Sequence, residues 1–180
     1  MTAGLPPIPL QVFNFTVTFR QVDAEGKPKA GAVALCSGRF SEVSGIEATM
    51  EPKAIREGGR NYGDIQRAGR VTFSTVILKR GVTRSPDLWT WFQLVGQGKT
   101  ATRLQAELIH SDWPDPPAPP ASGASFPQPE RPEVMRWTMT NALPVKFKAA
   151  AYSASASEVG IEELHFVHEG LSLAVGGRTV

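Results

Sequence analysis

The sequence contains very little cysteine. Its single cysteine, Cys36, excludes an intrachain disulfide and any metal site built from several cysteines, so packing must hold the fold together. No stretch approaches the roughly 18 apolar residues that a membrane span needs. Residues 1–9 lack the cationic start and the apolar run of a secretory signal. We therefore expect a protein that is made in the cytoplasm and has no direct membrane anchoring.

The sequence also lacks an excess of either charge. Nineteen Lys and Arg stand against 17 Asp and Glu, a net charge of +2, which gives no strong reason to expect a nucleic-acid or membrane-surface protein. The length of 180 residues fits one domain, residues 1–180. An apolar fraction of 41% is sufficient for a core.

The hydrophobic pattern predicts a mainly β protein. In residues 13–19, aromatic and aliphatic side chains alternate with polar ones, which is typical of a strand with one buried face. Further strands are predicted at residues 32–40, 102–110, 134–140, 145–147, 159–166 and 171–175. The apolar parity slips within 159–166, which indicates a β-bulge or burial on both faces.

A long hairpin is predicted in the first half of the chain. Residues 46–55 and 71–79 are rich in β-branched side chains and flank a polar, glycine-rich segment, residues 57–69. Neither face of the second strand is simply polar, as expected when the second face meets another subunit instead of water.

One short helix is predicted to begin at Ser85, whose hydroxyl would cap it, with Pro86 at the first helical position and Asp87 favourable to the helix dipole. It would end at Gly96 and Gly98. Core packing is a better explanation than cofactor binding for its aromatic residues, and the helix would cover a barrel end or a sheet face. Its core stripe consists of Leu88, Trp91, Phe92 and Val95.

Residues 114–132 contain eight prolines in 19 residues. We interpret this segment as a solvated loop, partly polyproline II, at the tip of a hairpin formed by residues 102–110 and 134–140. The alternative is a docking site for a partner domain with an aromatic groove.

Residues that carry chemistry are few. The sequence has no nucleophile elbow, P-loop or dinucleotide motif. His165, His168 and Glu169 suggest a metal site, but a spacing of three puts the two histidines on opposite faces of a strand. Seven basic residues against two acidic ones in residues 56–84 suggest DNA binding, but aromatic side chains for stacking are missing. We therefore predict no enzyme activity, catalytic residue, metal or cofactor.

Six short blocks then occur in a characteristic order. They are residues 40–47 (FSEVSGIE), 56–59 (REGG), 78–81 (LKRG), 88–92 (LWTWF) with Gly98 and Lys99, Trp137 with 141–146 (NALPVK), and 168–171 (HEGL). The series closely resembles the inner tail tube proteins of contractile phage tails and of phage-like extracellular contractile injection systems.

The resemblance implies a tail-tube-type β-barrel or sandwich with one short α-helix and a long inter-subunit hairpin. Such proteins form hexameric rings that stack into a hollow conduit for cargo or DNA. The implied partners are further copies of the chain, a contractile sheath protein, and baseplate or tube-initiator proteins, in a particle that is released from the cell. The residues expected at inter-subunit contacts are Glu57, Gly58, Gly59, Arg60, Asn61, Arg70, Lys79 and Arg80.

Two departures from the family pattern leave alternatives open. Ala68 replaces a common proline, and the insertion at residues 114–132 is long. The chain is then either a bulk tube subunit or a specialised tube-initiating or baseplate-adjacent ring subunit. In a different class, it is a monomeric β-barrel binding module with a Pro-rich docking loop. The tube hypothesis predicts that Glu57→Ala or Arg80→Ala weakens ring stacking while the monomer stays folded.

Overall fold

The computed structural model describes residues 9–22, 40–99, 102–112, 131–155 and 157–179. These residues form one helix and twelve strands. In chain order they are β1 (Phe15–Gln21), β2 (Glu42–Ser44), β3 (Ala48–Met50), β4 (Lys53–Ile55), β5 (Ile65–Arg67), β6 (Val71–Phe73), β7 (Val76–Gly81), α1 (Asp87–Gly96), β8 (Leu104–Ser111), β9 (Glu133–Lys148), β10 (Ile161–Val167), β11 (Gly170–Val175) and β12 (Arg178–Thr179).

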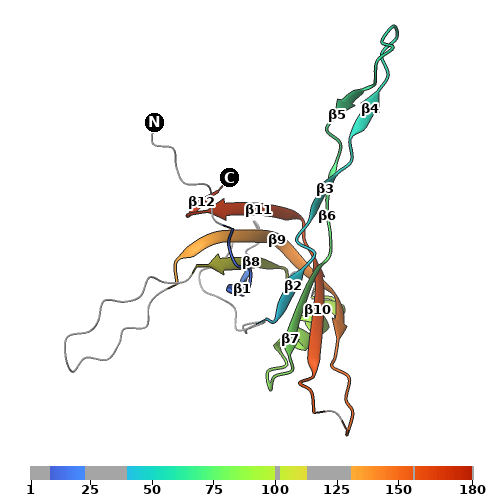
Figure 1. The fold of residues 1–180 in the computed structure, drawn as a ribbon. Helices are drawn as coiled ribbons and strands as arrows, with labels where there is room; N and C mark the ends of the chain where they lie inside the picture. The colour runs from blue at the N-terminus through green and yellow to red at the C-terminus, as the bar shows by residue number, and fades with distance from the viewer. Residues whose placement is uncertain (1–8, 23–39, 100–101, 113–130, 156, 180) are drawn as a thin grey trace, which may run out of the picture.

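The long strand β9 joins two antiparallel sheets (Figure 1). Its first half lies between β8 and β11, and its second half pairs with β10. Beyond β8 the first sheet continues to β1, and beyond β10 the second continues through β7 to β2. Within the described part of the chain, β1 and β2 end this path without pairing to each other. The predicted mainly β fold is therefore confirmed as an open sandwich.

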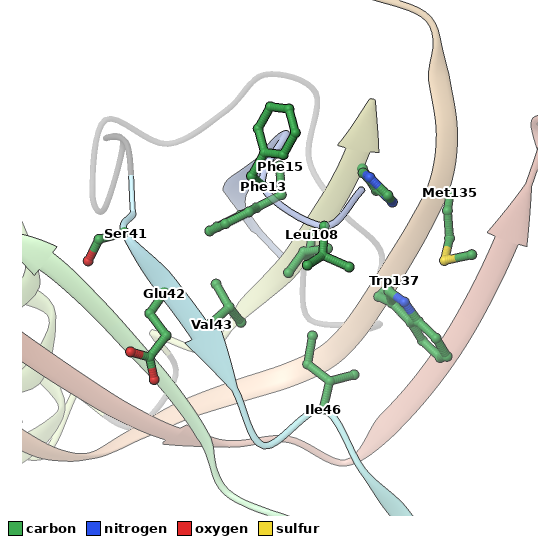
Figure 2. Close-up of a pocket in the computed structure, with 11 residues that line it drawn as sticks. Phe13, Phe15, Ser41, Glu42, Val43, Ile46, Leu108, Met135 and Trp137 are labelled. Carbon is green, nitrogen blue, oxygen red and sulfur yellow. The ribbon is translucent and has the colours of Figure 1, made fainter. Parts of the chain in front are cut away.

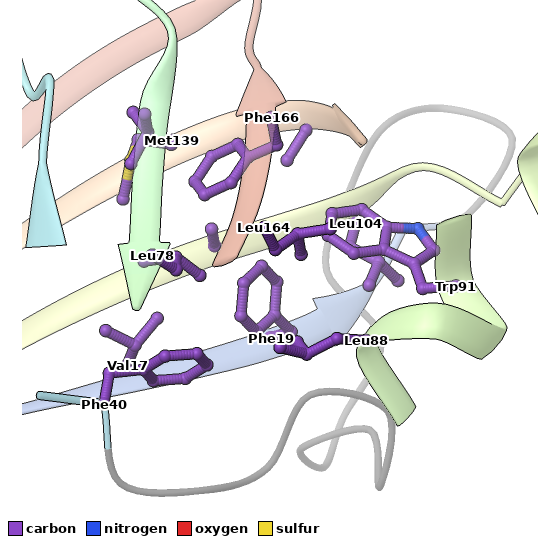
Figure 3. Close-up of a cluster of buried hydrophobic side chains, with 13 residues drawn as sticks. Val17, Phe19, Phe40, Leu78, Leu88, Trp91, Leu104, Met139, Leu164 and Phe166 are labelled. Atoms are coloured by element: carbon purple, nitrogen blue, oxygen red, sulfur yellow. The ribbon is translucent and has the colours of Figure 1, made fainter. Parts of the chain in front are cut away.

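The hydrophobic core lies between the two sheets and the helix (Figure 3). The ring of Phe19 packs edge-on against Trp91 at 5.4 Å between centroids and against Phe166 at 6.0 Å. Leu88 and Trp91 are buried, and Val95 packs against this core. Phe92 is half-buried, with its ring beside that of Trp89. Helix α1 thus covers one end of the sandwich with its apolar stripe.

The start of the helix differs from the prediction. It begins at Asp87, Pro86 occupies the N-cap position, and no side chain caps it. Ser85 is not the cap. Its backbone N–H donates to the Thr83 hydroxyl at 3.3 Å, and its carbonyl accepts from Arg80 at 3.3 Å. The preference of serine for the N-cap position is overridden here, because the buried Arg80 side chain donates to the Ser85 carbonyl.

The prediction of two strands at residues 134–140 and 145–147 is wrong, because both belong to the continuous strand β9. The proline inside it, Pro144, sits where the register shifts. His165 of β10 pairs with Lys146, while the next residue, Phe166, pairs with Pro144. A proline is tolerated at such a bulge because it has no N–H to contribute to the ladder. The parity slip in residues 159–166 has another cause than the predicted bulge or two-sided burial. β10 pairs with β7 without a break from Ile161 to Phe166, Leu164 and Phe166 are buried, and Val159 and Ile161 are exposed on the other parity.

Some predictions fall outside the described residues. They concern most of the possible strand at residues 32–40, Cys36, and nearly all of the Pro-rich segment. β8 and β9 flank that segment and pair up to Ser111 and Glu133, as a hairpin between them requires. The described part of the chain contains no helix that is long and apolar enough to span a membrane.

Candidate assembly interface

Residues 47–74 leave the two sheets as a two-stranded arm (Figure 1). In this arm β3 pairs with β6 and β4 with β5, and neither pair joins the main sheet. At the base, Ser74 donates to Glu47 at 3.2 Å through its backbone N–H and again through its hydroxyl. No residue of the arm is buried. Because an isolated two-stranded hairpin is only marginally stable in water, the arm needs another surface to hold it.

In the part of the arm nearest the sheets, Met50 and Val71 form an exposed apolar pair. They are direct partners across β3 and β6, and they remain 51% and 39% exposed. A pair of this kind indicates a protein contact, since burying it against a second surface removes apolar area from water.

The tip of the arm carries five of the residues expected at a subunit contact: Glu57, Gly58, Gly59, Arg60 and Asn61, all of which are exposed. Within the turn, the Arg60 N–H donates to the Glu57 carbonyl at 3.3 Å, and Gly59 adopts a φ of 86° that favours glycine. Arg70 is exposed further down the arm. The structure thus gathers six of the eight predicted contact residues on one projection.

The other two, Lys79 and Arg80, lie on β7 in the body of the subunit. Lys79 pairs with Glu42 on β2 at 2.9 Å, and this hydrogen bond raises the pKa of the lysine.

The Arg80 side chain is 2% exposed, so it is not available to a neighbouring subunit. Its Nε donates to Glu162 at 2.6 Å, and its Nη atoms donate to Asp87. Burial opposes the charge, but the hydrogen bonds to Asp87 and Glu162 leave the pKa of Arg80 raised. Arg80 therefore ties β7, α1 and β10 together within one subunit. The expectation that Arg80→Ala leaves the monomer folded is corrected accordingly.

The root of the arm rests on a turn of the main sheet. The Phe73 ring stacks on His168 at 4.9 Å between centroids. His168 is buried, its Nδ1 donates to the Gly170 carbonyl at 3.0 Å, and burial lowers its pKa. Where the chain leaves β2, Gly45 has a φ of 82°, and a Cβ there would lie 2.1 Å from the Thr75 carbonyl oxygen. Only glycine fits this close approach, so the backbone conformation at the root of the arm is fixed.

An apolar groove of about 460 Å³ opens between the edge strands β1 and β2 (Figure 2). Val43 and Ile46 lie on one side, and Leu108 and Trp137 on the other. The remaining apolar lining residues are Val12, Phe13, Phe15 and Met135. The sequence does not reveal this groove, because alternation in residues 13–19 shows that Phe13 and Phe15 share a face, but not that the face stays partly uncovered.

The residues considered for a metal site have other contacts. His165 lies 3.4 Å from Glu163, while His168 bonds to Gly170. Across the part of the chain that the structure describes, no group of three or more His, Cys, Asp and Glu side chains is arranged to hold a metal ion.

Comparison with known proteins gives a consistent family. The family model for the T4-like virus tail tube protein gp19 matches residues 11–172. A chain in the cryo-EM structure of the anti-feeding prophage baseplate, six-fold symmetrised, has 22% identity and a TM-score of 0.67, over 95% of this chain and 99% of that one. A chain in the sheath-tube complex of the extracellular contractile injection system PVC has 15% identity and the same TM-score, over 93% and 92%. A comparison with curated protein sequences finds no match.

The gp19 model covers far more than half of this chain, and the similar solved chains share the fold of this chain. The chain is a structural subunit of a contractile tail tube. It belongs to the T4-like virus tail tube protein family.

Proposed function

We propose that this chain forms homohexameric rings that stack into the hollow inner tube of a contractile tail or injection particle. The family supports a tube subunit. The six-fold symmetry of the anti-feeding prophage baseplate and the sheath-tube complex of PVC, which contain similar chains, support a six-subunit ring inside a sheath.

The observation that carries this proposal is the arm. It projects from a well-packed subunit, pairs with nothing in the main sheet, and buries none of its own residues. Such a segment costs conformational entropy to order and recovers little in the monomer. Its stabilisation therefore comes from a neighbouring copy, either in the same ring or in the next one.

In this role the protein supplies rigidity and a conduit, and it performs no catalysis. The sheath moves the assembled tube, baseplate or initiator proteins begin it, and cargo or DNA occupies its lumen. The subunit is made in the cytoplasm and leaves the cell as part of the particle.

Negative-stain electron microscopy of the purified protein over a range of concentrations tests the proposal. We expect rings or stacked tubes from the parent chain. Replacing residues 48–73 with a short Gly-Ser turn should leave a folded monomer, judged by circular dichroism, that forms neither.

Glu57→Ala and Arg60→Ala at the arm tip should weaken stacking of rings. Glu158→Ala, an exposed residue outside the arm, is the matched control and should stack normally. Normal tubes from the arm-deleted chain would contradict the proposal.

A ring subunit next to the baseplate is a second candidate, because the similar chain with 22% identity belongs to a baseplate structure. The two functions differ in the length of the assemblies. A bulk tube subunit elongates as more protein is added, whereas an initiating subunit stops at one or a few rings.

A further inference from the structure

A ring built from one kind of chain needs two different surfaces on each subunit. Its contacts are head-to-tail, so every copy presents a donor surface to one neighbour and an acceptor surface to the other. The proposed function, on which this inference rests, lets the arm contact a copy in the same ring or in the next one. The inference takes the same ring, with the arm as the donor. The acceptor must lie elsewhere on the same chain.

We propose that the Met50–Val71 pair of one arm inserts into the apolar groove between β1 and β2 of a neighbouring copy. The groove has the chemistry of an acceptor. Its lining is mostly aliphatic and aromatic, with Ser41, Glu42 and His110 as the polar members, and its residues Val12 and Phe13 remain 82% and 59% exposed. An apolar cleft with such exposed side chains is typical of a surface that a protein partner covers.

The position of the groove suits an inserted hairpin. β1 and β2 end the described sheet path, so the groove lies where the sandwich is open. A hairpin from another copy would fill this opening and cover edge strands that otherwise invite uncontrolled pairing.

The arm of the same subunit cannot reach this groove. Ile46 lines the groove, and Met50 lies four residues further along an extended chain, about 13 Å away at the rise of a β-strand. β3 is held in that direction by its pairing with β6, and the arm runs away from the sheets (Figure 1). The apolar pair is therefore directed outward, toward another copy.

Charge gives the contact an orientation. Arg70 directly precedes Val71 and is exposed, so a positive charge flanks the donor pair. Glu42 lines the acceptor groove with its side chain 51% exposed, although it also pairs with Lys79. Opposite charges at matching positions favour one docking direction over its reverse.

Disulfide trapping tests the pairing directly. In a Cys36→Ser background, Met50→Cys and Phe13→Cys are combined, rings are assembled, and a mild oxidant is added. We expect covalent oligomers up to the hexamer on a non-reducing gel, because only cysteines with Cα atoms within about 7 Å form the bond. The control combines Met50→Cys with Trp89→Cys, an exposed position outside the groove, and should stay monomeric on the gel.

A second test changes only the arm and leaves the residues of the two sheets and the helix unaltered. Met50→Asp places a charge on the docking face of the arm and should lower ring formation about tenfold or more, because the carboxylate would lose its water in the groove. Thr49→Asp is the matched control, since successive side chains of a strand point to opposite faces. It should assemble far better than Met50→Asp.

The outcomes separate this inference from the proposed function. Rings that form without the Met50–Phe13 cross-link, or that cross-link equally through Trp89, would overturn the groove assignment and leave the tube function standing. Equal assembly of the two Asp variants would do the same. A parent chain that forms no rings at any concentration would overturn both.

Discussion

The side-chain amide of Asn141 donates a 2.8 Å hydrogen bond to the carboxylate of Glu169, joining β9 to the turn between β10 and β11. Asn141 has a φ of 53°, the only positive φ of a non-glycine residue within the described ranges. The Glu169 N–H donates to the Thr140 carbonyl at 3.0 Å, and Arg103 pairs with its carboxylate. The bonds from Asn141 and Arg103 lower the pKa of Glu169. Together these contacts fix the corner at which β9 passes from one sheet to the other.

Asn141 is suited to this corner because asparagine tolerates the left-handed conformation better than a β-branched residue does. We predict that Asn141→Val lowers the free energy of unfolding by about 1–3 kcal/mol. Asn141→Gly relieves the backbone but loses the bond to Glu169, so its loss should be about 1 kcal/mol or less. Urea denaturation of the monomer measures both, and equal losses would contradict the backbone argument.

Arg80→Met should destabilise the subunit by about 3–5 kcal/mol, because it leaves the carboxylates of Asp87 and Glu162 without their buried partner. Arg84→Met, on an exposed loop residue, is the matched control and should change stability little. Thermal or urea unfolding in dilute solution reports the effect without assembly.

Replacing Arg80, Asp87 and Glu162 together tests why Arg80→Met destabilises the subunit. Arg80→Met with Asp87→Leu and Glu162→Leu should recover much of the lost stability, since apolar groups of similar volume need no buried partner. A triple variant as unstable as Arg80→Met would show that packing of the arginine, and not the unpaired carboxylates, accounts for the loss.

Stability should decrease as pH falls below about 6.5, the ordinary pKa of histidine. Burial lowers the pKa of His168 in the folded subunit. Below 6.5 the unfolded chain binds a proton that the folded chain does not yet bind, so protonation favours unfolding. The slope from one such group is at most about 1.4 kcal/mol per pH unit, and it vanishes below the folded pKa.

His168→Phe keeps an aromatic ring against Phe73 but cannot titrate. It should flatten the loss of stability between pH 6.5 and 5, as measured by urea midpoints across that range. Both proteins should still lose stability below about pH 4.5, because there the unfolded chain takes up protons at Glu133, Glu163 and Glu169. Hydrogen-bonded partners lower the pKa values of these groups in the folded subunit and keep them ionised. An unchanged slope in His168→Phe would assign the effect to another group.

Deleting residues 114–132 and joining their ends by a short turn should leave both the monomer and its rings intact. The flanking strands β8 and β9 are antiparallel neighbours, so a short connection can close the hairpin. Electron microscopy and circular dichroism of the deletion measure this. Loss of rings would give the Pro-rich segment a part in assembly, and loss of a bound partner with intact rings would favour a docking loop.

Much of the fold is predictable from local patterns. Alternation in residues 13–19 predicts β1, which runs from Phe15 to Gln21. Two β-branched segments around a glycine-rich centre predict the arm, and helical spacing of Leu88 and Trp91 predicts the buried stripe of α1. Such periods can be read from sequence because a helix or strand with one buried face repeats its apolar residues at a fixed interval.

Charge pairing was decided by tertiary structure alone. In the sequence, Arg80 is one of several basic residues near the hairpin, and only the pairing of β7 with β10 and the approach of α1 place its guanidinium between Asp87 and Glu162. The groove and the continuity of β9 are likewise absent from any local pattern. Periodicity shows which face of an element is buried, but the partner of a charge and the depth of a cleft depend on contacts between segments that lie far apart in the chain.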